Sequence, residues 1–133
     1  MIILDTHVLV WYALDDERLG RSARRRIQAA VRATELGVSA ISYWEIAMLA
    51  AAGRLRLDGS PDAFRTEALA RGIDEVAVDG KIAIVASRLA GMHSDPADRI
   101  IVATALERAA TLITADAKIL AMKSGPARHD AQV

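Results

Sequence analysis

Short apolar runs alternate with longer stretches of helical spacing along this chain. The apolar runs over 1–4 and 111–114 each close on a polar residue, as buried strands do, and the segments 37–41 and 74–78 predict two more strands. Helical spacing and capping signals predict helices over 6–14, 22–34, 42–52, 62–71, 81–90, 95–110 and 117–122. This alternation predicts an α/β fold: a parallel β-sheet of four to five short strands, flanked by α-helices on both faces.

The 133 residues fit a single domain, residues 1–133, in which about 124–133 form a tail that the pattern leaves unassigned. The chain carries 17 basic and 17 acidic residues, so any attraction to nucleic acid must come from local patches. It has no cysteine, which excludes disulfides, thiolate zinc sites and thiol nucleophiles. No signal peptide and no membrane-length apolar window is present, so we expect a cytoplasmic protein without membrane contact.

Four acidic residues fall where an apolar run ends or a helix begins: Asp5, Glu45, Asp98 and Asp116. Ligands of open α/β sheets bind beyond the carboxyl ends of the strands, so this placement predicts one shared anionic pocket. Carboxylates gathered in a pocket raise one another's pKa values unless a cation neutralises them. Because the cluster offers oxygen alone, it favours Mg²⁺ or Mn²⁺.

Each acid also has an ordinary structural interpretation. Asp5 and Asp116 suit helix N-caps, and Asp98 lies in a first helical turn, where the helix dipole favours negative charge. The segment Ser42–Glu45 has the pattern of a capping box, with Ser42 as the N-cap. Taken together, however, two acids at strand ends and two at helix starts exceed what capping requires, so we favour a functional site.

Four stretches carry a resemblance to a known family: residues 3–9, 42–47, 95–105 and 112–116. In their order and sequence the chain resembles the PIN-domain ribonucleases, specifically the VapC toxins of bacterial VapBC toxin–antitoxin pairs, from Met1 to about Met122. The resemblance implies a PIN-like parallel sheet and Mg²⁺- or Mn²⁺-dependent endonucleolytic hydrolysis of RNA phosphodiesters by metal-activated water. It also implies a homodimer that is silenced by a cognate VapB-type antitoxin.

Carried onto this sequence, the resemblance implies that Asp5, Glu45 and Asp98 are the core catalytic and metal-binding acids, with Asp116 as a more variable fourth. Asp95 is a nearby acid of second rank, because its role as a helix cap explains it. The hydroxyls of Thr6 and Thr114 are candidates for orienting carboxylates or water. Candidates for RNA contact are Arg24, Arg25 and Arg99, although an Arg-rich run more often forms a solvated face.

Three other functions compete with a nuclease. A haloacid-dehalogenase-like phosphatase also begins with an apolar strand and an Asp, but it requires a second Asp two residues later, where this chain has His7. A phospho-acceptor signalling domain requires an acidic pair after the first strand and a lysine after the last one, but here Asp5 stands alone and Lys118 is misplaced. A catalytically silent PIN-like binding module remains an alternative, and the intact set of acids argues against it.

Overall fold

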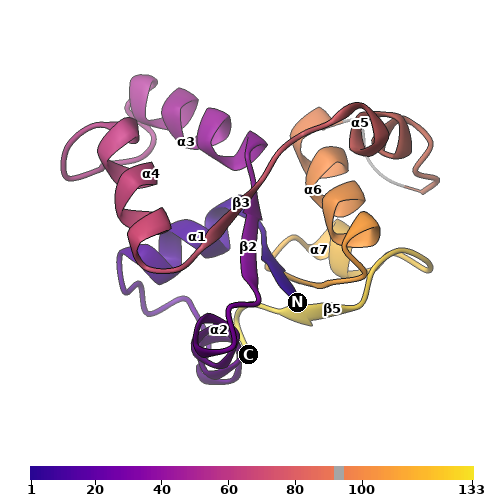
Figure 1. Cartoon of the computed structure of the whole chain (residues 1–133), viewed down its shortest axis with the longest axis horizontal. Coiled ribbons are helices and arrows are strands. Elements are labelled where there is room, and N and C mark those ends of the chain that lie inside the picture. Colours follow the sequence, from indigo (N-terminus) through magenta and orange to yellow (C-terminus); the bar gives the residue numbers. More distant parts are fainter. Residues whose placement is uncertain (92–94) are drawn as a thin grey trace.

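The computed structural model describes residues 1–91 and 95–133, and these residues form one five-stranded parallel sheet with helices on both faces (Figure 1). The strands are β1 (Ile2–Leu4), β2 (Leu36–Ser39), β3 (Asp74–Val76), β4 (Thr111–Thr114) and β5 (Arg128–Asp130). Their order in the sheet is β3-β2-β1-β4-β5, and every neighbouring pair is parallel. The predicted fold class is therefore confirmed.

Seven helices are described: α1 (Thr6–Ala13), α2 (Arg21–Arg32), α3 (Ile41–Ala51), α4 (Pro61–Ala70), α5 (Gly80–Ser87), α6 (Pro96–Glu107) and α7 (Ala117–Leu120). Helices α1 to α4 lie on one side of the sheet, and α5, α6 and α7 lie on the other (Figure 1). Of the helices in the described part of the chain, none has both the length and the apolar character that a bilayer crossing requires.

The side chains of the central strands alternate between these two layers. Leu4 of β1 and Ile113 of β4 belong to the core under α1 and α2, whereas Ile3 and Leu112 belong to the core under α6 and α7. All four side chains are fully buried. Because successive residues of a strand face opposite sides, a sheet covered on both faces needs continuous apolar runs, which is why these strands lack polar alternation.

The chain winds outward from the middle of the sheet in two directions. It passes from β1 through β2 to the edge strand β3, and then crosses back to β4 on the other side of β1. The carboxyl ends of β1 and β4 are therefore adjacent, at the point where the strand order reverses, and the Asp5 amide still donates to the Ile113 carbonyl there at 3.0 Å. Such a switch point is where open α/β sheets place their ligands.

The predicted capping box at Ser42 is wrong. Strand β2 ends at Ser39, two residues earlier than expected, and α3 begins at Ile41, so Ser42 lies inside the helix. The N-cap is Ala40, whose side chain makes no cap hydrogen bond. The hydroxyl of Ser42 instead lies 2.8 Å from Thr6 Oγ1, so a contact with α1 takes the place of local capping.

The unassigned tail completes the sheet. Strand β5 pairs with β4, and the register is extended by bonds from the Leu112 amide to the Ala127 carbonyl and from the Ala131 amide to the Thr114 carbonyl. Beyond β5, the carbonyl of Val133 accepts a hydrogen bond from the Ser22 amide in the first turn of α2. The Arg-His-Asp sequence of β5 has no apolar alternation, so its pairing depends on the edge that β4 offers.

Candidate metal centre

A cleft of about 500 Å³ opens where β1 and β4 end. Its lining includes all four predicted acids and the second-rank Asp95, and it consists of Asp5, His7, Trp11, Arg18, Glu45, Asp95, Asp98, Ala115, Asp116 and Gln132. The tertiary structure thus brings together acidic side chains that are up to 111 positions apart in the sequence, from Asp5 to Asp116. Five of the ten lining residues are carboxylic acids, so the cleft is strongly anionic when they are ionised.

Asp5 is the most deeply placed acid, with 6% of its surface exposed. Its Oδ1 accepts the Thr6 amide at 2.8 Å, which confirms the expected N-cap of α1, and its Oδ2 accepts the Thr114 hydroxyl at 2.6 Å. Burial raises the pKa of Asp5 above its ordinary value, and the hydrogen bonds from Thr114 and Thr6 oppose that rise. These bonds fix the carboxylate at the floor of the cleft.

Thr6 links α1 to α3. Its Oγ1 lies 2.5 Å from Glu45 Oε1 and 2.8 Å from Ser42 Oγ. A hydroxyl has one proton and an ionised carboxylate only accepts, so Thr6 donates to Glu45 and accepts from Ser42. Burial raises the pKa of Glu45, with further contributions from Asp5 and Asp95, while the Thr6 bond lowers it. The chain of hydroxyls holds Glu45 toward the other acids.

Glu45, Asp95 and Asp98 form the tightest group of acids. Each offers a carboxylate oxygen, and these oxygens all lie within 4.8 Å of one another. Asp95 also caps α6, because its Oδ1 accepts the amides of Ala97 at 2.9 Å and Asp98 at 3.2 Å. A carboxylate has two oxygens with several acceptor positions, so capping a helix and joining the acid group are compatible.

Asp98 is perturbed both by burial and by the charges of its neighbours. Its partial burial, followed by the charges of Asp5, Asp95, Glu45 and Asp116, raises its pKa from 3.8 to about 7. Since the neighbouring carboxylates disfavour its ionisation, a cation held among them would return the pKa of Asp98 toward its ordinary range.

Asp116 lies at the rim of the acid group, half-buried at the start of α7. Its Oδ1 accepts the amides of Lys118 at 2.8 Å and Ile119 at 3.2 Å, which confirms the expected N-cap. Its own amide donates to Thr114 Oγ1 at 3.0 Å. Thr114 therefore joins Asp5 to the Asp116 backbone, and the two acids at the strand ends are held by one hydroxyl.

The donor set fits a divalent cation. The close group supplies carboxylate oxygen alone, which suits hard cations, and its acids repel one another without a counter-charge. Thiolate donors are absent from the whole sequence.

The three arginines expected to contact RNA do not line the cleft. Arg99 donates from Nε to the Ala86 carbonyl at 3.0 Å and from Nη2 to the Leu89 carbonyl at 3.0 Å, so its head group joins α6 to the end of α5. Arg24 pairs with Asp15 at 2.9 Å, and Arg25 is exposed on α2. Their contact with RNA stays a prediction.

Two lining residues come from segments whose sequence pattern does not connect them with the acids. Arg18 lies in the turn between α1 and α2, and Gln132 follows β5. Gln132 carried no signal, because its approach to the cleft depends on the pairing of β5 with β4.

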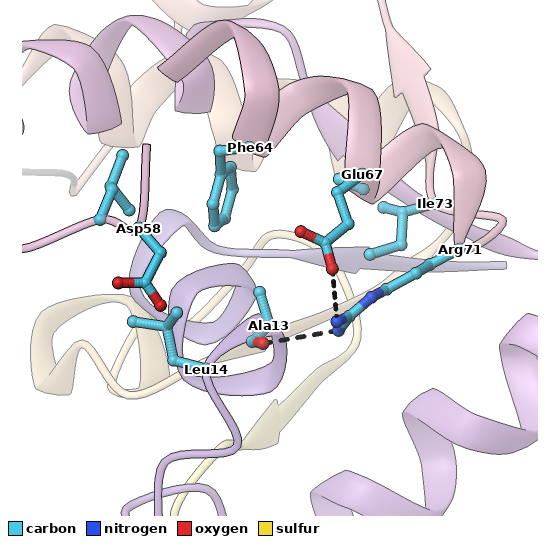
Figure 2. Close-up of a pocket in the computed structure, with 9 residues that line it drawn as sticks. Ala13, Leu14, Asp58, Phe64, Glu67, Arg71 and Ile73 are labelled. Atoms are coloured by element: carbon cyan, nitrogen blue, oxygen red, sulfur yellow. Dashed lines mark hydrogen bonds and ion pairs between the residues drawn. The ribbon is translucent and has the colours of Figure 1, made fainter. Parts of the chain in front are cut away.

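A second pocket, of about 210 Å³, lies between the end of α1 and α4. Figure 2 shows Arg71 donating both to Glu67, at 2.8 Å, and to the Ala13 carbonyl, at 3.4 Å, while Phe64 and Leu14 form an apolar wall. Its basic side chain already has protein partners, and it contains none of the clustered acids. This pocket is therefore a packing feature between helices rather than a competing centre.

The fold and site together define a doubly wound α/β domain that carries a carboxylate cluster at its switch point. The sequence profile of the PIN domain matches residues 2–124. The chain is 35% identical over 119 residues to Ribonuclease VapC22 of Mycobacterium tuberculosis, covering 89% of this chain and 88% of that protein. The chain belongs to the PIN domain family.

Solved structures agree with this assignment at the level of the fold. The VapBC2 complex of Rickettsia felis, bound to a promoter DNA fragment, contains a chain with a TM-score of 0.71 at 15% identity, covering 97% of this chain and 98% of that one. DNA-bound VapBC from Salmonella typhimurium gives a TM-score of 0.69 at 18% identity, covering 97% and 96%. FitAcB from Neisseria gonorrhoeae gives 0.66 at 22% identity, covering 98% of both chains.

Proposed function

We propose that this protein is a divalent-metal-dependent endoribonuclease and the toxin of a toxin–antitoxin pair that acts in the cytoplasm. The observation that carries the proposal is the group of Glu45, Asp95 and Asp98, whose oxygens lie within 4.8 Å of one another in a cleft at the switch point. The similarity to a ribonuclease over 89% of the chain supports RNA as the substrate.

In this proposal Glu45, Asp95 and Asp98 hold the cation, with Asp5 and Asp116 adding negative charge beside them. Mg²⁺ and Mn²⁺ are the cations that suit an oxygen-only site in a nuclease. When bound, the cation supplies Lewis-acid activation of the attacking water and neutralises charge that develops on the phosphate.

The protein's own contribution is positioning. Thr6 holds Glu45 at 2.5 Å, and Thr114 holds Asp5 at 2.6 Å, so the acids keep their geometry without relying on substrate. Supporting hydrogen bonds of this kind orient ligands and sustain their basicity. Because Asp98 has a pKa of about 7, it must lose a proton before it can serve as a ligand at acidic pH.

The test is cleavage of a labelled RNA with Mg²⁺, with Mn²⁺ and with EDTA. The wild type is expected to cleave with either cation and not with EDTA, and to leave a phosphomonoester intact. Asp98→Asn is expected to lose at least about 100-fold in rate, as metal-site changes commonly do. The matched control is Asp62→Asn, which changes an exposed acid in the first turn of α4. A folded wild type that cleaves no RNA with either cation overturns the proposal and favours a silent binding module.

We further propose that a VapB-type antitoxin docks beside the cleft and directs a basic side chain toward the acids. Trp44 and Met48 are 55% and 50% exposed, one turn apart on α3 and next to Glu45 in the helix, so they are suitable anchors. The third large apolar side chain near the cleft, Trp11 of α1, is 7% exposed and packs in the core, so it does not offer an anchor. The similarity to chains of VapBC complexes supports such a partner.

A further inference from the structure

The cleft poses an electrostatic problem for a nucleic-acid substrate. Five carboxylates line it, and each phosphate of an RNA strand adds another negative charge. Bound cations offset part of this charge at the scissile phosphate, but the neighbouring phosphates still approach an acidic wall. Among the described residues that line the cleft, Arg18 is the one lysine or arginine.

Arg18 is held in a fixed orientation. Its Nε and Nη2 donate to the two oxygens of Asp16 at 3.1 Å and 2.7 Å, a bidentate pair. The guanidinium also lies 5.1 Å from the ring centre of Trp11, whose indole is buried in the core. An arginine fixed on two sides loses little conformational entropy when it binds a further group.

The head group of Arg18 retains binding capacity. A guanidinium has five N–H donors, and the bidentate pair with Asp16 uses two of them. The side chain is 62% exposed although it is anchored at both sides. A planar, permanently charged donor of this kind matches the oxygens of a phosphate.

We propose that Arg18 is the phosphate-binding residue that positions the RNA strand across the acid cluster, at a phosphate next to the scissile one. This inference rests on the proposed nuclease function and deepens it. Arg18 is a positioning residue: it binds a phosphate that does not react, so it strengthens ground-state and transition-state binding equally. Its loss therefore raises KM and leaves kcat nearly unchanged.

The variant that tests this role is Arg18→Gln, which keeps the length of the side chain and removes the charge. The matched control is Arg65→Gln, because Arg65 forms the same bidentate pair, with Glu75 at 2.6 Å and 3.1 Å, and is 50% exposed outside the cleft. Arg18→Lys keeps the charge but not the forked donor geometry of the guanidinium, and it is the second test variant if Arg18→Gln fails to fold. Thermal melting establishes that each variant is folded.

Two measurements follow. Steady-state cleavage of a short RNA with Mg²⁺ is expected to give a KM about tenfold higher for Arg18→Gln, with kcat within about twofold of the wild type, and an intermediate KM for Arg18→Lys. Binding of the same fluorescein-labelled RNA is then measured by anisotropy in an Asp98→Asn background, in which cleavage is expected to be slow. There Arg18→Gln should raise Kd about tenfold and lower the slope of log K against log salt by about 0.7, the value for one phosphate of a single strand.

The inference would be overturned if Arg18→Gln and Arg65→Gln gave the same KM, Kd and salt slope. The nuclease function would remain intact in that case. Unchanged RNA binding combined with weaker binding of a purified antitoxin would overturn it in favour of a protein-docking role for Arg18. Rapid cleavage in the Asp98→Asn background would instead count against the proposed catalytic site, so failure of the two proposals is distinguishable.

Discussion

Replacing Asp98 by Asn tests whether the acids of the cleft are in electrostatic conflict. In the native protein the pKa of Asp98 is raised from 3.8 to about 7, first by burial and then by the carboxylates around it. A group whose pKa is raised on folding contributes stability while it is protonated, and that stability is lost as the pH rises through the folded pKa. Above about pH 7, ionised Asp98 therefore destabilises the metal-free protein.

The magnitude follows from the same values. A tenfold change in acid dissociation corresponds to ~1.4 kcal/mol, so the difference between 3.8 and about 7 sets an upper limit of about 4 kcal/mol. Asp98 is only half-buried, and solvent screening reduces this to about 1–2 kcal/mol. For a domain of this size, Asp98→Asn should then raise the Tm by roughly 3–8 °C at about pH 8 in EDTA.

The assay is thermal unfolding followed by circular dichroism, at about pH 8 and about pH 4, with EDTA or with Mg²⁺. At about pH 4 the native Asp98 is protonated, so the Tm values of variant and wild type should converge. Mg²⁺ should stabilise the wild type by mass action and the variant much less. Asp62→Asn, which removes an exposed charge in the first turn of α4, should lower the Tm slightly or leave it unchanged in EDTA at both pH values. A lower Tm for Asp98→Asn at about pH 8 in EDTA would refute the reasoning.

Three further changes separate structural from functional roles. Glu45→Gln keeps an oxygen that accepts the hydrogen bond from Thr6, so the Tm should stay within about 2 °C of the wild-type value. RNA cleavage should fall at least about 100-fold, because the variant lacks the charge that binds a hard cation. Intact cleavage would exclude Glu45 from the site. Gly20→Ala places a Cβ 2.2 Å from the Val133 backbone carbon and should lower the free energy of unfolding by about 2 kcal/mol in a denaturant titration. Gly80→Ala, whose Cβ would have no atom within 4 Å, should not destabilise the protein. Equal effects of the two changes would show that the tail moves freely. Trp44→Ala should weaken antitoxin binding at least about tenfold in calorimetry and leave cleavage within about twofold, and unchanged affinity would exclude α3 as the docking surface.

The pattern of apolar and capping residues was sufficient to predict the main strands and helices. The runs at β1 and β4 are buried on both faces, and the caps at Asp5, Asp95 and Asp116 use amides only one to three residues away. Such interactions are local, and they depend on the residue type and its spacing alone. For the same reason the sequence alone was sufficient to predict that acids lie at the ends of strands.

The close partners of these acids depended on how the elements pack. Asp95 was expected to be an acid of second rank whose main role is to cap a helix, yet the packing of α3 against α6 brings Glu45 within 4.8 Å of the carboxylates of Asp95 and Asp98. Ser42 looked like an N-cap, yet its hydroxyl contacts Thr6, 36 positions away. Distances between elements follow from core packing, which no local pattern encodes.

The sequence by itself determined the first four strands, the acids that follow β1 and β4 and, through its resemblance to the PIN-domain ribonucleases, what chemistry to expect. Only the tertiary structure decided that 128–130 is a strand, because its polar residues pair through backbone bonds to β4 and leave no apolar signature. Only the tertiary structure placed Arg18 at the cleft, because the other walls of the cleft come from distant segments that carry Glu45, Asp98 and Asp116. A side chain acquires such a role from residues that are close in space, and these contacts form only when the strands have paired and the helices have packed on the sheet.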